Sequence, residues 1–215
     1  MRKQIAVVAA IAAGVTVSST QASIVGGTVT GESGVIDAGG TFVFLTPGIF
    51  FPSNPANTVG DNNFQTPNLY GFDEDQNIIL PGDIDVDIGP SGGLAAGTVV
   101  ASHYVFFDPA STSTLTGTVT FDSDVLAILT RTSTMAATDF LANTGVNYLN
   151  DGLRGLEGGD SVSISASDPR TIEIDFTAGS PGDYIRVLTA ESPVPEPNSI
   201  AAAFACGGLL LRRRR

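Results

Sequence analysis

Apolar and polar residues alternate along several stretches of this chain, most regularly between positions 161 and 177. Apolar residues occupy every second position in 162–166 and again in 172–176, with Asp168-Pro169-Arg170 between the two stretches. Successive side chains of a β-strand point to opposite faces, so each stretch predicts a strand with one buried and one solvated face. The Asp-Pro sequence is typical of a turn, and the two strands together predict a β-hairpin.

Shorter apolar stretches predict that sheet dominates the rest of the chain as well. Only Thr138 favours a helix, because it could cap a short turn over 139–142. Many strands with scattered turns predict an all-β fold, an antiparallel β-sandwich of jelly-roll-like form. An up-and-down barrel and a β-helix are alternatives, although the sequence lacks the fixed repeat of a β-helix. The further predicted strands are 41–45, 78–80, 84–88, 98–107, 118–121, 125–130 and 184–189.

The N-terminus has the order of a secretory signal peptide. Arg2 and Lys3 precede an apolar run over 5–17, and a short polar stretch follows it. Thr20 and Ala22 are the small residues that a signal peptidase requires before its cut. The apolar run is too short to span a bilayer comfortably, since about 20 residues are needed. We therefore expect residues 1–22 to be removed after Ala22 by signal peptidase during export.

The C-terminus, residues 192–215, carries a second segment with three parts. Pro193, Pro195 and Pro197 hold an extended, accessible stretch, and an apolar run over 200–211 follows it and can form a short membrane helix. The chain ends in an arginine cluster, which stays on the cytoplasmic side of a membrane. The sorting residues predicted here are Val194, Pro195, Glu196, Pro197, Arg212, Arg213, Arg214 and Arg215.

This C-terminal segment resembles the PEP-CTERM sorting signal. The resemblance covers about 20 residues and rests on the Val-Pro-Glu-Pro motif, the short apolar segment and the terminal arginines; Asn198 stands where the commonest form has serine. In that family a membrane protease called exosortase reads the signal, in bacteria that make extracellular polysaccharide. The resemblance implies cleavage near the motif, a transient membrane anchor, and transfer of the body to the cell surface or extracellular matrix.

The body between these segments, residues 23–191, is strongly acidic and reads as one domain. It contains 21 Asp and Glu against four Arg and no Lys, so the excess of negative charge lies in the body. Nucleic-acid binding rests on Lys and Arg that displace counterions, and this composition excludes it. The chain's only cysteine, Cys206, lies in the C-terminal apolar run, so the processed body would hold no disulfide and no thiolate metal site.

The segment 83–89 offers the sharpest candidate chemistry. On a strand, Asp83, Asp85 and Asp87 would place three carboxylates on one face, about 6.5–7 Å apart, and such oxygens suit calcium. Gly89 lies one place late for an EF-hand loop, and Leu94 stands where that loop has its closing glutamate, so an EF-hand is excluded. The alternative to calcium binding is a solvated outer face above buried apolar residues.

A second acidic segment follows two aromatic residues at 70–75. Asp73 and Asp75 could line a sugar cleft or complete a calcium site, with Tyr70 stacking against a sugar ring. The alternative is a charged turn after a buried aromatic pair.

Enzyme chemistry has little support in the sequence. His103 is the only histidine, which excludes a zinc site built on several histidines, and no Gly-x-Ser-x-Gly elbow accompanies it. A hydrolase with a pair of carboxylates stays possible on composition alone. We therefore expect a non-enzymatic surface or matrix protein; the alternatives are a calcium-assisted carbohydrate-binding module and a secreted hydrolase.

Overall fold

The computed structural model describes residues 21–31, 40–48, 50, 53, 55–179 and 181–192. Ala22 and most of the body therefore fall within it, whereas the predicted signal peptide up to residue 20 and the sorting residues 194–215 lie outside the described residues. Within the described ranges, no helix has the length and apolar character needed to cross a membrane.

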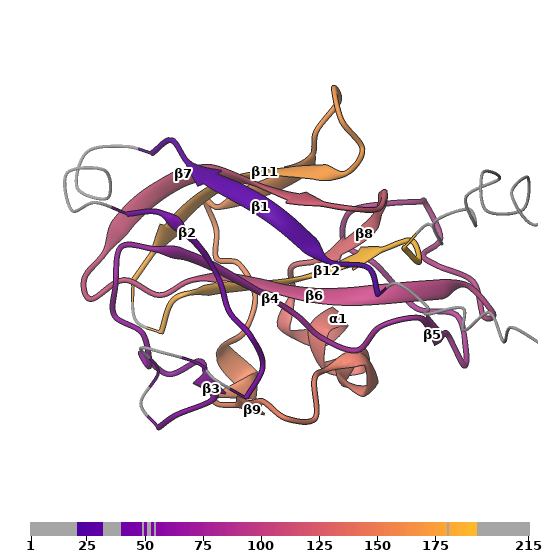
Figure 1. Cartoon of the computed structure of the whole chain (residues 1–215), viewed down its shortest axis with the longest axis horizontal. Helices are drawn as coiled ribbons and strands as arrows, with labels where there is room; N and C mark the ends of the chain where they lie inside the picture. The colour runs from indigo at the N-terminus through magenta and orange to yellow at the C-terminus, as the bar shows by residue number, and fades with distance from the viewer. Residues whose placement is uncertain are drawn as a thin grey trace, which may run out of the picture.

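Four strands form the upper sheet in Figure 1, all antiparallel and in the order β1-β7-β11-β10. The hairpin predicted around Asp168 is confirmed, because β10 and β11 pair with Val162 opposite Ile174. The strand predicted at 118–121 is the end of a longer strand. The bounds are β1 Ile24–Val29, β7 Ser113–Phe121, β10 Ser161–Ile164 and β11 Thr171–Ala178.

A second sheet lies beneath the first and has the order β2-β4-β6-β12-β8, with β5 paired to β6. The β2–β4 pair is parallel and the other pairs are antiparallel. A separate parallel pair joins β3 and β9. The bounds are β2 Phe42–Phe44, β3 Thr58–Val59, β4 Leu69–Asp73, β5 Ile78–Ile79, β6 Val99–Phe107, β8 Val125–Leu129, β9 Asn147–Tyr148 and β12 Asp183–Thr189.

The two large sheets enclose one hydrophobic core. Leu115, Val119 and Phe176 from the four-stranded sheet belong to the same buried cluster as Val105 and Ile185 from the six-stranded sheet. The period-2 pattern of β11 explains its place in this core, because its apolar residues are buried while its charged ones face solvent. The all-β prediction is therefore confirmed.

The other face of the six-stranded sheet carries a third layer of loops and short helices, at the bottom of Figure 1. A second cluster fills it, with Phe72, Tyr104 and Phe106 on the sheet and Met135 and Leu141 on the helices. Every residue of β12 is buried as a result. The helices are α1 Thr132–Ala137, η1 Asp139–Leu141 and η2 Asp151–Leu153, where η denotes a 3₁₀ helix.

The helical turn predicted after Thr138 is present as η1, but Thr138 does not cap it with its side chain. Its hydroxyl instead donates to the carbonyls of Thr134 and Met135 in the preceding helix α1. Helix α1 had no signal in the sequence, since no capping side chain marks its start and no acidic residue lies in its first turn.

Candidate functional sites

The acidic segment 83–87 is not a strand, so the predicted strand at 84–88 is wrong. Isolated bridges join Ile84 to Leu94 and Ile88 to Ile128, and a tight turn over 90–93 lies between Ile88 and Leu94. Gly93 makes that turn possible: its φ is +79°, and a Cβ there would lie 2.0 Å from the carbonyl oxygen of Ile84. The regular 6.5–7 Å spacing expected for a strand therefore does not apply to these carboxylates.

The carboxylate of Asp87 is already hydrogen-bonded by neighbouring parts of the protein. Its Oδ2 accepts hydrogen bonds from the backbone N–H groups of Thr130 (2.7 Å) and Arg131 (3.0 Å) and from the Thr134 hydroxyl. Burial alone would raise the pKa of Asp87, but these bonds and the charge of Arg131 outweigh it and hold the pKa below its ordinary value. Asp87 thus fastens the start of helix α1.

Asp83 and Asp85 are exposed, and Asp83 Oδ1 accepts a bond from the backbone N–H of Ala96 at 2.8 Å. The three aspartates do not converge: no group of three His, Cys, Asp or Glu side chains suited to a metal occurs among the described residues. The geometry of this segment gives no support to the calcium prediction.

Tyr70 lies in the core of the third layer and is 1% exposed. Its ring stacks on Phe106 and meets Phe64, and its hydroxyl bonds with Thr66. A sugar therefore cannot reach its ring face, and the structure does not place Tyr70 with the two aspartates predicted to act beside it.

Asp73 ends β4 and binds His103 on the neighbouring strand β6, where Nδ1 of the ring lies 2.7 Å from Asp73 Oδ1. The other ring nitrogen, Nε2, lies 3.0 Å from the Thr189 hydroxyl on β12. The order of carboxylate, imidazole and hydroxyl resembles a nucleophilic triad, but His103 and Thr189 are both fully buried. The three side chains tie strands β4, β6 and β12 together.

Asp73 and Asp75 do line a common pocket of about 340 Å³, which we call the Asp73–Asp75 pocket. Phe44, Gln76 and Asn143 also line it, and Phe44 is 43% exposed. Burial, and next the charge of Glu74, raise the pKa of Asp75 above its ordinary value. Oε1 of Gln76 is buried and has no hydrogen-bond partner among the described residues.

A buried ion-pair network lies next to this pocket and had no signal in the sequence. Arg186 on β12 and Glu74 are both fully buried and joined by two bonds, Nε to Oε2 at 2.7 Å and Nη2 to Oε1 at 3.0 Å. The hydroxyls of Ser102 and Tyr148 also donate to the Glu74 carboxylate. Burial alone would lower the pKa of Arg186, but the charge of Glu74 outweighs it and raises the pKa.

The network continues outward through Asp139, whose carboxylate joins Arg186 to a second arginine, Arg154. Both terminal nitrogens of Arg154 bind the Asp139 carboxylate, at 2.7 and 2.8 Å, while Nη1 of Arg186 lies 3.3 Å from its Oδ1. Burial alone would raise the pKa of Asp139, but the two arginines hold it below its ordinary value. Two of the four arginines of the body, Arg154 and Arg186, therefore hold the third layer to the sheet.

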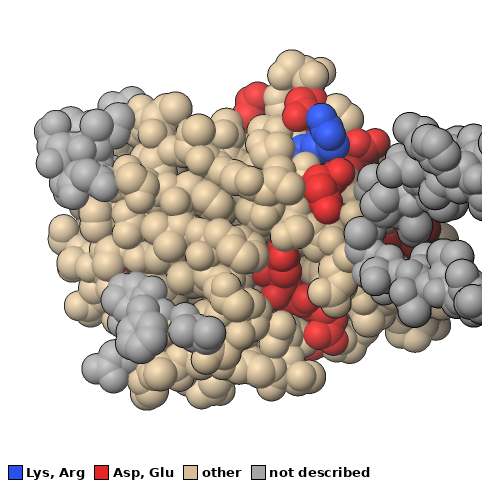
Figure 2. Space-filling view, viewed as in Figure 1, with Lys and Arg blue, Asp and Glu red and all other residues tan. Residues whose placement is uncertain are grey.

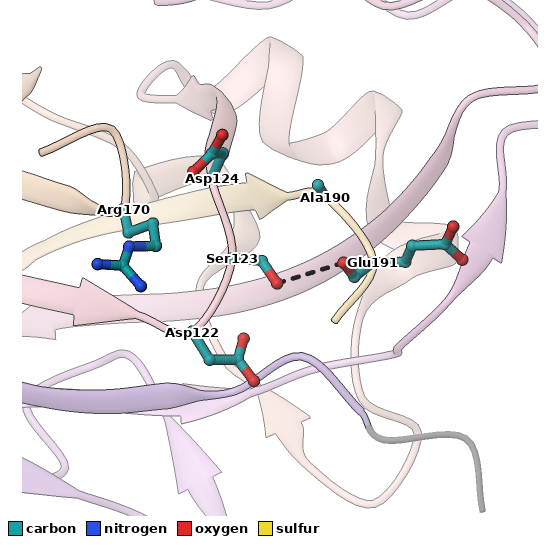
Figure 3. Close-up of a pocket in the computed structure, with 6 residues that line it drawn as sticks. All are labelled: Asp122, Ser123, Asp124, Arg170, Ala190 and Glu191. Carbon is teal, nitrogen blue, oxygen red and sulfur yellow. Dashed lines mark hydrogen bonds between the residues drawn. The ribbon is translucent and has the colours of Figure 1, made fainter. Parts of the chain in front are cut away.

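Figure 3 shows a further pocket, between the β7–β8 loop and the end of β12. Asp122, Asp124 and Arg170 line it together with Glu191, whose carbonyl accepts a bond from the Ser123 hydroxyl. Asp122 also binds both ends of the body: its Oδ1 accepts the backbone N–H of Ser23 at 3.0 Å and its Oδ2 the hydroxyl of Ser192 at 3.1 Å.

Two buried carboxyls lie at the far end of strands β6 and β12. Burial, and then the charges of Asp160 and Glu157, raise the pKa of Asp183 to about 7. Burial also raises the pKa of Asp108 to about 6, against the opposing effect of loop amides such as the N–H of Phe64, which donates to its Oδ2 at 2.9 Å. One oxygen of each, Asp183 Oδ2 and Asp108 Oδ1, is buried without a hydrogen-bond partner among the described residues.

Comparisons with known proteins found no matching family model, no matching curated protein and no matching solved structure. The arguments about function therefore rest on the residues and contacts described above.

Proposed function

We propose that this chain is exported through the inner membrane and sorted by an exosortase-type protease to the cell surface or extracellular matrix. Its acidic body, a jelly-roll-like sandwich, would act there as a non-enzymatic structural element of the extracellular polymer. Signal peptidase, the secretion machinery and exosortase are its processing partners. The observation that carries this proposal is the shared contact of Ser23 and Ser192 with Asp122.

That contact places the two ends of the body at one point of its surface. Strand β1 begins at Ile24 and β12 ends at Thr189, so cuts after Ala22 and near the Val194–Pro197 motif would both fall outside the strands. Because both ends leave the body at one point, either flanking segment can anchor the body to a membrane without pulling a strand out of a sheet. This arrangement suits removal of the C-terminal segment from a folded domain, whereas the cut after Ala22 would come before folding, because Ala22 is fully buried in the folded body.

A non-enzymatic role agrees with the burial of the best catalytic geometry. Catalysis by the Asp73–His103–Thr189 arrangement would require a substrate to reach Thr189, whose side chain is fully enclosed. The hydrolase alternative would have to use exposed carboxylates, and no contact in the described part of the chain singles out a pair of them.

The sorting proposal is tested in a bacterium that carries the exosortase system. We expect the triple change Pro195→Ala, Glu196→Ala and Pro197→Ala to leave uncut protein in the membrane fraction, as seen by immunoblot and mass spectrometry. The change Pro193→Ala, just outside the motif, is the matched control and should mature normally. Normal maturation of the triple variant would refute the assignment.

A second candidate function is carbohydrate binding at the Asp73–Asp75 pocket. Its support is the combination of an exposed aromatic face, Phe44, with acceptor oxygens from Asp73 and Asp75. Sugar hydroxyls donate to such acceptors, and the apolar face of a sugar ring stacks on an aromatic side chain. A cation such as calcium, bound together with the sugar, belongs to this candidate.

A glycan panel in millimolar calcium, probed with the purified protein, tests this candidate. Saturable binding to one glycan class should fall at least tenfold on Phe44→Ala. Phe140, which is 44% exposed on η1 and is not among the residues that line the pocket, provides the matched control Phe140→Ala. A blank panel with folded protein would leave the structural role alone.

A further inference from the structure

Two carboxylates, those of Asp122 and Asp73, accept three hydrogen bonds from Ser23 and the residue that follows it. Its backbone N–H donates to Asp122 Oδ1 at 3.0 Å, and its hydroxyl donates to Asp73 Oδ2 at 2.7 Å. The next backbone N–H, that of Ile24, donates to Asp73 Oδ1 at 3.1 Å. Asp122 lies in the loop between β7 and β8 and Asp73 at the end of β4, so Ser23 bridges the two large sheets.

The electrostatic surroundings of the Ser23 nitrogen are predominantly negative. Besides Asp122 and Asp73, the adjoining loops present Asp124 and Glu191, while the cationic groups nearby in the described part of the chain are Arg170 and, when protonated, His103. His103 binds the same Asp73 oxygen that accepts the Ile24 N–H. A positive charge placed on the Ser23 nitrogen would therefore be stabilised.

Cleavage after Ala22 would supply that charge. Hydrolysis breaks the bond between the Ala22 carbonyl carbon and the Ser23 nitrogen; water gives its OH to the carbonyl and a proton to the nitrogen. An α-amine has an ordinary pKa of about 7.7–8.0 and takes up a further proton at neutral pH. Replacing the amide donor by an ammonium group adds the attraction between two opposite charges to the hydrogen bond with the carboxylate.

We propose that the Asp122 and Asp73 carboxylates form a binding site for the α-ammonium group of Ser23, so that removal of the signal peptide locks the first strand into the body. The inference rests on the cleavage after Ala22 included in the proposed function. The site ties the new N-terminus to Ser192 through Asp122, and to β6 through Asp73 and His103.

The same cut changes the Asp73–Asp75 pocket. Gln21 is one of the residues that line this pocket, and Ala22 beside it is fully buried. Both residues leave with the signal peptide. The processed body would therefore lose one of the side chains that line this pocket.

The test uses the chain from Ser23 to Arg215, kept in detergent and made from a fusion whose removal leaves Ser23 first. Lys3 is the chain's only lysine, so the α-amine of Ser23 is then the only primary amine. Competitive acetylation across a pH series, read by mass spectrometry, gives its pKa directly. We expect a pKa above about 8.5, raised by the carboxylates, against the ordinary value of about 7.7–8.0.

Stability gives an independent measurement. A raised amine pKa stabilises the fold below the unfolded value and loses that effect as pH rises through the folded value. We expect the protein with free Ser23 to melt about 2–4 °C above its fully acetylated form at pH 6, with no difference at pH 10.5. A version that retains Gln21 and Ala22 should behave as the acetylated form does.

Asp122→Asn should return the amine pKa to its ordinary range, whereas Asp124→Asn, in the same loop, is the matched control and should lower it much less. If Asp122→Asn does not fold, the acetylation pKa of the unaltered protein decides alone. An ordinary pKa there overturns the inference and leaves the sorting proposal intact. Processed protein from producing cells that begins at a residue other than Ser23 overturns the inference together with the predicted cleavage.

Discussion

Replacing Asp183 by asparagine should stabilise this protein at neutral and alkaline pH. Asp183 begins β12, is 2% exposed, and has a carboxyl oxygen, Oδ2, that is buried without a partner among the described residues. Burial and the charges of Asp160 and Glu157 disfavour its ionised form, which raises its pKa to about 7. Above pH 7 the ionised carboxylate of Asp183 therefore destabilises the folded state relative to a neutral side chain at this position.

The size of the effect follows from the pKa difference. The folded value of about 7 lies roughly three units above the ordinary value of 3.8, which corresponds to about 4 kcal/mol of destabilisation once the carboxyl is ionised in both states. The folded state binds the proton more tightly, so stability falls as pH rises from about 4 to about 7 and is level beyond. An asparagine N–H₂ left without an acceptor costs about 1–3 kcal/mol in return. We expect a net gain of about 1–3 kcal/mol at pH 8.

Urea unfolding of the chain from Ser23 onward, followed by circular dichroism at pH 4, 6 and 8, measures this directly. Asp183→Asn should gain stability at pH 8 and show no gain, or a loss, at pH 4. Asp175→Asn, at an exposed position on β11, is the matched control and should leave the pH dependence unchanged. An Asp183→Asn variant whose difference from the unaltered protein is the same at all three pH values would refute the reasoning.

Two further substitutions test the packing of the sheets. Arg186→Met should lower the free energy of unfolding in urea by about 3–5 kcal/mol, because it leaves the fully buried carboxylate of Glu74 without its cation. Adding Glu74→Gln should recover part of that loss. A loss under about 1 kcal/mol for Arg186→Met alone would contradict the prediction. Gly117→Ala should cost about 1–3 kcal/mol, because a Cβ there would lie 2.4 Å from the Thr28 carbonyl oxygen on β1. Gly26, where a Cβ meets nothing within 4 Å, is the control for the glycine, and equal effects of Gly26→Ala and Gly117→Ala would contradict the prediction.

The sequence predicted β10 and β11 from their alternation and β6 and β12 from their apolar runs, but it missed β4. Strand β11 alternates strictly between buried and exposed positions, so its hairpin with β10 could be predicted from period 2 alone. Strand β4 has four consecutive buried residues and a central Gly71, because the other sheet covers one of its faces and the third layer the other. A strand buried on both faces loses its alternation, and β4, with five residues and a central glycine, also lacks the longer apolar run that marked β6 and β12.

The surroundings of the candidate site residues depend largely on contacts that the sequence does not show. Asp87 looks like a solvated carboxylate on an alternating strand, yet its hydrogen bonds go to residues 43 to 47 positions later in the chain. Arg186 alternates with apolar neighbours and would be read as surface, but the third layer encloses it. Asp73 and Asp75 do share a pocket, because they lie on one side of the chain where β4 ends. Contacts between residues distant in sequence decide the chemistry in each case.

The distribution of charge limits what this surface can bind. Between residues 4 and 211 the chain has four arginines and no lysine, and Arg154 and Arg186 are buried in ion pairs. Figure 2 accordingly shows acidic residues in two groups toward one side of this face, with basic atoms beside only the upper group. Such a surface repels an anionic polymer unless divalent cations bridge the two. If the matrix polysaccharide is anionic, its association with this protein should therefore require calcium or magnesium and be lost with a chelator; association that survives the chelator would contradict this reasoning.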